Sequence, residues 1–183
     1  MNPFYIILGV IGVLAVWVMF AYNGLVSLVN LTKNAWSDID VQLKRRYDLI
    51  PNLVETVKGY AKHEKGVFEE VTKARSVAMG AKGIEEKGQA ENMLTGALKS
   101  LFAVSENYPT LRASENFSKL QDELTQTENN IESSRRFYNA NVRDLNTKIE
   151  TVPTNIIANM FGFKQQEFFQ ATGSEKDAVK VSM

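Results

Sequence analysis

The chain of 183 residues contains no cysteine and only one histidine, His63. The absence of cysteine excludes disulfide bonds, thiolate nucleophiles and cysteine-ligated metal or iron–sulfur sites. A single histidine cannot form the H-E-x-x-H site of zinc proteases or the two Glu-x-x-His motifs of di-iron bundles. No serine stands at a recognisable spacing from His63. The sequence therefore predicts a protein that is not an enzyme and that binds no metal and no cofactor.

Net charge is also absent, because 21 lysines and arginines balance 21 aspartates and glutamates. Nucleic-acid binders usually show a basic excess or a basic face. Here the cations cluster only at Lys44-Arg45-Arg46 and at Arg135-Arg136. We therefore expect no nucleic-acid partner, and we treat these five side chains as candidate interaction residues. They could face a partner, a lipid head group or a buried carboxylate.

The first segment, Phe4 to Tyr22, contains no charged residue. At a rise of 1.5 Å per residue, roughly 19 helical residues cover most of a hydrocarbon core of about 30 Å. A cleaved signal peptide would need a basic start, a shorter apolar run and a small-x-small cleavage site. None of these is present, so residues 1–24 are predicted to be an uncleaved transmembrane anchor.

The orientation of the anchor follows from the cations around it. No lysine or arginine precedes the span, whereas Lys33 and then Lys44, Arg45 and Arg46 follow it. The positive-inside rule then places the amino terminus outside and the rest of the chain in the cytoplasm. Most of these cations lie more than about 20 residues beyond the span, where the rule weakens.

Beyond the anchor, apolar residues recur at alternating steps of three and four, the period of a packed helix seam. The membrane helix is expected to continue to Ile50, and Pro51 to end it or to open the next helix. The further expected helices are residues 53–78, 90–107, 114–152 and 155–161, with a glycine-rich loop over 80–89 and Gly162 as a helix cap.

The predicted fold is all-α: an N-terminal transmembrane helix continuing into an elongated antiparallel bundle of long helices. The bundle domain covers residues 25–163. Residues 164–183 are predicted to be a tail that is largely flexible at its end, from Ala171 onward.

Several seam positions carry polar residues where a simple bundle would have leucine: Thr32, Arg46, Glu64, Thr127 and Ser134. Two interpretations remain open. The seam is partly open and long side chains reach solvent along it, or the polar residues fix the register and pairing of the helices.

Four phenylalanines near the end of the chain, Phe161, Phe163, Phe168 and Phe169, also allow two interpretations. They are buried against the bundle, or they form an exposed docking patch for another subunit or for the bilayer surface. We take Phe161 and Phe163 as candidate interaction residues.

Three stretches together resemble the LemA family of bacteria: "AWSDIDVQLKRRYDLIPNLV" (35–54), "YPTLRASENF" (108–117) and "RRFYN" (135–139). The resemblance implies a single-pass protein of the bacterial inner membrane with its amino terminus outside and a helical body in the cytoplasm. The family has no established enzymatic activity. It includes a protein needed for building magnetosome membranes, and its genes often lie beside those of membrane metalloproteases or TPM-domain proteins.

Two functional hypotheses follow. In the first, the chain is a scaffold that self-assembles as a homo-oligomer on membrane lipid and organises or curves the membrane. In the second, it is an adaptor for a membrane protease, a TPM-domain protein or another membrane partner. Neither hypothesis requires a catalytic residue.

Overall fold

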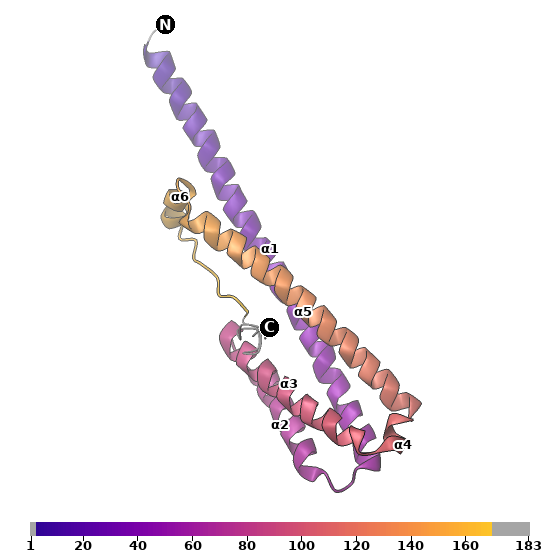
Figure 1. Cartoon of the computed structure of the whole chain (residues 1–183). Coiled ribbons are helices and arrows are strands. Elements are labelled where there is room, and N and C mark those ends of the chain that lie inside the picture. The colour runs from indigo at the N-terminus through magenta and orange to yellow at the C-terminus, as the bar shows by residue number, and fades with distance from the viewer. Residues whose placement is uncertain (1–2, 170–183) are drawn as a thin grey trace, which may run out of the picture. The chain divides into compact units, whose positions relative to one another are not determined.

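The computed structural model describes residues 3–169, and these residues contain helices and no β-strand. The all-α prediction is therefore confirmed. In chain order (Figure 1) the helices are α1 (Pro3–Tyr60), α2 (Lys65–Gly80), α3 (Ile84–Glu106), α4 (Pro109–Arg112), α5 (Glu115–Glu150) and α6 (Thr154–Phe161). The predicted flexible end of the tail lies outside the described residues.

Helix α1 does not end at Pro51, so the predicted corner at this proline is wrong. The helix continues to Tyr60, and the chain turns at residues 61–64, where the exposed His63 lies. A proline inside a helix has no N–H to donate to the carbonyl four residues earlier. For Pro51 this acceptor is the carbonyl of Tyr47.

A side chain of α2 donates the hydrogen bond that Pro51 cannot. The Nε of Arg75 lies 2.7 Å from the carbonyl oxygen of Tyr47 and donates to it. Because a buried carbonyl without a donor is costly, this contact lets the helix run through the proline. The same hydrogen bond joins α2 to α1.

The glycine-rich loop is shorter than predicted, because α3 begins at Ile84 rather than near residue 90. Glu85 and Glu86 lie in its first turn, where carboxylates interact favourably with the helix dipole. The Glu86 carboxylate also accepts a hydrogen bond of 2.8 Å from the N–H of Lys82. The turn itself needs Gly83, whose φ of 83° is left-handed.

The later boundaries agree with the sequence. Pro109 opens the short α4, and Ser114 immediately precedes α5. Helix α6 ends at Gly162, which adopts the predicted left-handed cap with φ 72° and ψ 26°. The N–H of Phe163 then donates to the carbonyl of Ala158 at 2.9 Å.

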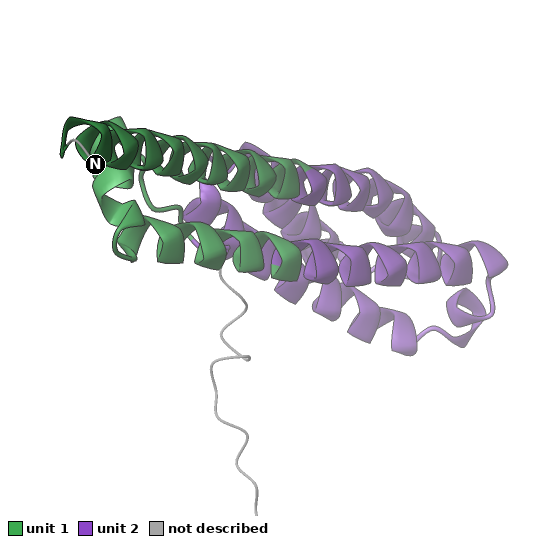
Figure 2. Ribbon diagram, turned by 90° about the horizontal axis from the view of Figure 1, so that it is seen from above, with its two compact units in different colours: residues 1–37, 136–167 green, residues 38–135, 168–183 purple. Residues whose placement is uncertain are grey.

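The helices form two compact units, shown in Figure 2. Unit 1 comprises residues 1–37 and 136–167, and unit 2 comprises residues 38–135 and 168–183. Helices α1 and α5 each contribute to both units. The division into an anchor at 1–24, a bundle at 25–163 and a tail at 164–183 stays a prediction.

Unit 2 has a core contributed by α1, α2, α3, α4 and α5, with α2 and α3 packed against each other. In unit 2, nearly all the residues that recur at steps of three and four along the predicted helices are buried. Tyr60, which is 45% exposed, is the clearest exception. Among the apolar side chains of this core that are at most 1% exposed, the largest are Ile39, Leu43, Ile50, Leu53, Leu94, Leu101 and Leu111.

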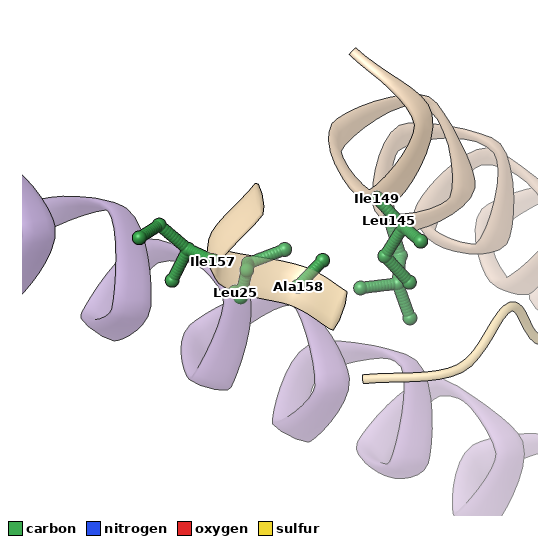
Figure 3. Packing of buried hydrophobic residues seen from close by; sticks show 5 residues of the cluster. All are labelled: Leu25, Leu145, Ile149, Ile157 and Ala158. Atoms are coloured by element: carbon green, nitrogen blue, oxygen red, sulfur yellow. The ribbon is translucent and has the colours of Figure 1, made fainter. Parts of the chain in front are cut away.

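Unit 1 has its own smaller core, which joins α1 to α5 and α6. Leu25 of α1 packs with Leu145 and Ile149 of α5 and with Ile157 and Ala158 of α6 (Figure 3). At the other end of this unit the rings of Trp36 and Tyr138 meet edge to face, with centroids 5.4 Å apart.

The bridge over Pro51 can be tested by exchanging its donor. Arg75→Met should lower the free energy of unfolding by about 1 kcal/mol, because the Tyr47 carbonyl loses its partner. Pro51→Ala alone should cost little, since the alanine N–H can reach that carbonyl. In the Pro51→Ala background the cost of Arg75→Met should therefore shrink. The measurement is unfolding of the full chain in detergent, followed by circular dichroism. Equal costs in both backgrounds would contradict the proposed bridge.

Candidate functional site

A charged residue lies at the centre of unit 2. The side chain of Arg46 is only 2% exposed. Its Nη1 donates to the carboxylate of Glu91 at 2.8 Å, and its Nη2 donates to the hydroxyl of Thr95 at 2.8 Å. Its Nε lies 2.8 Å from a carboxylate oxygen of Glu128, as a close ion pair rather than an aligned hydrogen bond. We call Arg46, Tyr47, Glu91, Thr95 and Glu128 the Arg46 cluster.

Tyr47 completes the cluster from the next position on α1. Its hydroxyl hydrogen-bonds with the carboxylate of Glu91 and lies 3.3 Å from the carbonyl oxygen of Ala78. Burial raises the pKa of Tyr47 far above its usual value, and the hydrogen bond and charge of Glu91 raise it further. The phenol therefore stays neutral at physiological pH and serves Glu91 as a donor.

The Arg46 cluster contains one cation and two carboxylates. Glu91 is buried, whereas the side chain of Glu128 is partly exposed. Burial raises the pKa of Glu128, although the positive charge of Arg46 acts in the opposite direction. The negative charge of Glu91 raises this pKa as well. The cluster thus joins α1 to α3 and α5 inside one unit.

The structure decides what Arg46 faces among the alternatives that the sequence left open. Its guanidinium meets the buried carboxylate of Glu91 and the partly exposed carboxylate of Glu128, while Lys44 and Arg45 are exposed. The Lys44-Arg45-Arg46 triplet is therefore not one surface patch, and only Lys44 and Arg45 remain available to a partner. Whether they bind one stays a prediction.

Sequence reasoning missed Glu91 and Glu128 as partners of Arg46. Glu91 continues the seam of Leu94, Leu98 and Leu101 by one step of three toward the amino terminus. That signal was hidden because residues 80–89 were expected to form a loop, which placed Glu91 at a helix end. Glu128 follows the seam residue Thr127 directly, so its sequence position suggested a solvent-facing side chain.

The two residues of the second basic pair, Arg135 and Arg136, also differ in their surroundings. Arg135 is half-buried and lines a cavity of about 190 Å³ beside Arg46, together with Glu91, Glu128 and the buried Phe169. Arg136 is exposed. Among the residues that the structure describes, no group of three or more carboxylates or histidines could hold a metal ion.

A different kind of surface occupies the first half of α1. Its side chains are apolar and exposed; Val13, for example, is 71% exposed. No residue of the 18-residue window of highest hydropathy is buried by the described part of the chain. Within residues 3–169, α1 is the one helix that is long and apolar enough to cross a membrane.

The four phenylalanines of the end segment divide between the two interpretations. Phe163 packs against the core of unit 1 and Phe169 is buried, whereas Phe161 and Phe168 are about half exposed. The rings of Phe161 and Phe163 both meet Tyr22 of α1, with centroids 4.8 and 5.7 Å away. The aromatic cluster therefore lies where the continuous apolar run of α1 ends, since the polar Asn23 follows Tyr22.

The sequence model of the LemA family matches residues 35–183, which is most of the chain and includes the Arg46 cluster. This chain belongs to the LemA family. The match covers all of unit 2 but begins after the apolar part of α1.

Relatives of this LemA-family chain include magnetosome proteins. Magnetosome protein MamQ 2 of Paramagnetospirillum magneticum is 27% identical over 190 residues, covering 90% of this chain and 70% of its own length. MamQ of Magnetospirillum gryphiswaldense is 28% identical, covering 82% of this chain and 65% of its own length. The protein LemA of Metamycoplasma hominis is 29% identical, covering 87% of this chain and 74% of its own length.

The importance of the buried guanidinium can be measured against its neighbour. Arg46→Met should lower the free energy of unfolding by about 3 kcal/mol, because Glu91 and Glu128 lose their cation inside unit 2. Arg45→Met, a matched change at an exposed position, should alter it by less than about 0.5 kcal/mol. Chemical unfolding of both variants in detergent gives the comparison. Similar losses in the two variants would contradict the assignment of Arg46 to the interior.

The raised pKa of Glu128 predicts a dependence of stability on pH. The pKa of Glu128 in the folded state is raised above 4.5, its ordinary value in an unfolded chain. The folded state therefore binds this proton more tightly than the unfolded state. Protonation of Glu128 therefore adds stability as the pH falls through the folded pKa, and the gain is complete below about 4.5. The free energy of unfolding of the wild type minus that of Glu128→Gln should rise accordingly.

The measurement is a series of unfolding curves between about pH 7 and pH 4 for the wild type and for Glu128→Gln. Glu123→Gln, on the exposed side of the same helix, controls for the loss of one carboxylate. A wild-type minus Glu128→Gln difference that is constant over this range would show that the burial of Glu128 does not affect its titration.

Proposed function

We propose that this LemA-family protein is a non-enzymatic, membrane-anchored helical scaffold whose copies associate and organise the membrane. One observation carries the proposal. The first half of α1 is uncharged and exposed, and the same helix continues without a break into the buried core of unit 2. The helix is thus suited to two surroundings.

The physical argument for lipid around the first half of α1 is the nature of its surface. Large apolar side chains, such as Val13 and Phe20, cover it on all sides, and exposing them together to water is unfavourable. A continuous helix satisfies its own backbone hydrogen bonds, which is the condition for crossing a bilayer. We therefore assign Phe4 to Tyr22 to the hydrocarbon core.

The orientation belongs to the same proposal. Lys33, Lys44 and Arg45 follow the span and are exposed, and no lysine or arginine precedes it. This asymmetry favours an amino terminus outside and the residues after the span in the cytoplasm, at the inner membrane of a bacterial cell.

Association between copies is supported by apolar side chains on the outside of the helices. Val41 on α1 and Phe137 on α5 are more than half exposed, although both lie on helices whose opposite faces are buried. Anchoring copies in one plane raises their local concentration, so that modest contacts become effective. The magnetosome proteins among the relatives further support a role in membrane organisation for this chain.

The adaptor hypothesis has its own observation, since Lys44 and Arg45 are exposed next to Val41. In that case these cations would bind a membrane protease, a TPM-domain protein or another membrane partner. The two functions differ in which substitutions matter: Val41 and Phe137 for self-association, Lys44 and Arg45 for a charged partner.

The proposal is tested with full-length protein in detergent and in liposomes. We expect a homo-oligomer by light scattering and by electron microscopy, and Val41→Glu with Phe137→Glu should dissociate it because charges then face an apolar contact. Asn34→Glu adds the same charge at an exposed polar position of α1 and should leave assembly intact.

A chain that remains monomeric at every concentration, in detergent and in liposomes, would overturn the scaffold. If assembly is lost only on Lys44→Ala with Arg45→Ala, the contact is charged rather than apolar. If those two changes abolish capture of a membrane partner while assembly persists, the adaptor hypothesis is favoured.

A further inference from the structure

The segment that contains α6 has an unusual composition for a chain that is 23% charged. No charged residue occurs from Thr151 to Phe163, and Glu150 and Lys164 border the segment. Its apolar side chains exceed what the core of unit 1 requires. Ile157 and Ala158 are buried there, whereas Ile156 is 58% and Met160 is 69% exposed.

Two exposed apolar residues of α6, Ile156 and Met160, lie on one side of the helix. Successive residues are about 100° apart around a helix, so Ile156 and Met160, four apart, project in nearly the same direction. Asn155 and Asn159 are likewise four apart and form a separate polar edge. Helix α6 thus has an apolar arc wider than the part that packs in the core, with a narrow polar edge beside it.

The position of α6 within unit 1 indicates what its exposed apolar arc contacts. Ile157 and Ala158 belong to the core that includes Leu25 of α1 (Figure 3). Trp17, Val18 and Ala21 of α1 also pack against this core. The rings of Phe161 and Phe163 meet Tyr22. Helix α6 therefore packs beside the carboxyl end of the apolar span of α1, where in our proposal the span leaves the hydrocarbon core.

We propose that α6 is a second membrane-contacting element, an interfacial helix that inserts Ile156 and Met160 into the boundary between lipid acyl chains and head groups. This inference rests on the proposed anchor, because α6 lies at the boundary only if α1 crosses the bilayer. Its occupant is lipid because α6 packs in the same core as Trp17, Val18 and Ala21, which belong to the apolar span of α1.

The flanking residues fit this placement. Lys164 directly follows the uncharged segment and is exposed, so its ammonium can reach lipid phosphates while the neighbouring rings lie deeper. Tyr22, Phe161 and Phe163 form an aromatic cluster at the depth where aromatic side chains concentrate in membrane proteins.

The mechanical consequence concerns one leaflet only. Helix α1 crosses both leaflets, whereas α6 enters only the leaflet on the side where the residues after the span lie. An apolar helix embedded to about 5–10 Å expands the leaflet it enters and not the opposite one. The two contacts also fix unit 1 against rotation about the axis of α1. This gives the proposed scaffold a means to favour a curved membrane.

The absence of cysteine makes a direct test simple, because any introduced cysteine is the only one. Full-length variants Ile156→Cys, Met160→Cys, Asn159→Cys and Val13→Cys carry a nitroxide spin label and are reconstituted into phosphatidylcholine–phosphatidylglycerol vesicles. Electron paramagnetic resonance then compares collisions with oxygen, which concentrates in lipid, and with a nickel chelate, which stays in water. All four positions are exposed, so the labels do not enter a core.

We expect labels at Ile156 and Met160 to collide several-fold more with oxygen than with the nickel chelate, at a shallower depth than the label at Val13. The label at Asn159 should favour the nickel chelate. Water accessibility at Ile156 and Met160 with Val13 in lipid would overturn the interfacial helix and leave the anchor standing. Water accessibility at Val13 would overturn the anchor and the inference together.

A second copy of the chain is the competing occupant of this arc. Labels at Ile156 and Met160 that are shielded from both reagents, and whose spectra broaden through spin–spin interaction, would assign the arc to a dimer contact and overturn insertion into lipid. The Asn159 label on the same helix distinguishes this outcome from a general loss of mobility.

Discussion

The continuity of α1 is the constraint on which the rest of the structure depends. A transmembrane helix must satisfy every backbone hydrogen bond within itself, and this helix keeps the same geometry after it leaves the uncharged run. Only Pro51 removes a donor, and Arg75 of α2 replaces it at the carbonyl of Tyr47. The helix that carries the candidate anchor thus also provides one wall of the core of unit 2. Any movement of α1 would therefore displace the residues packed against it.

The Arg46 cluster plays a different part from the apolar core around it. An ion pair buried with its hydrogen bonds often contributes little net stability, because desolvation of the charges offsets their attraction. Its geometry is demanding, however, since Arg46 needs Glu91 and Thr95 from α3 and Glu128 from α5 at the same time. A slipped helix would leave a buried charge without a partner. We infer that the cluster selects the register of the helices, which apolar side chains alone specify weakly.

The exposed apolar surfaces support our proposal that this LemA-family protein acts through contacts rather than through chemistry. In our proposal α1 crosses the bilayer, α6 rests at its boundary, and the outer faces of α1 and α5 meet other copies. These three contacts use different residues, so they can be separated by substitution. A scaffold built in this way would act through the number and arrangement of its copies.

The sequence by itself determined the helical class, the uncharged run, the seam residues and the Gly162 cap, because each depends on local periodicity or on the conformation of one residue. It also indicated that Arg46 occupies a seam position. Only the tertiary structure decided that α1 passes through Pro51. The tertiary structure likewise brought Arg46 into contact with Glu91 and Glu128, and it left Lys44 and Arg45 exposed. Those outcomes depend on donors, acceptors and charges supplied by residues distant in the chain, such as Arg75 for Tyr47, and local patterns do not report on distant partners.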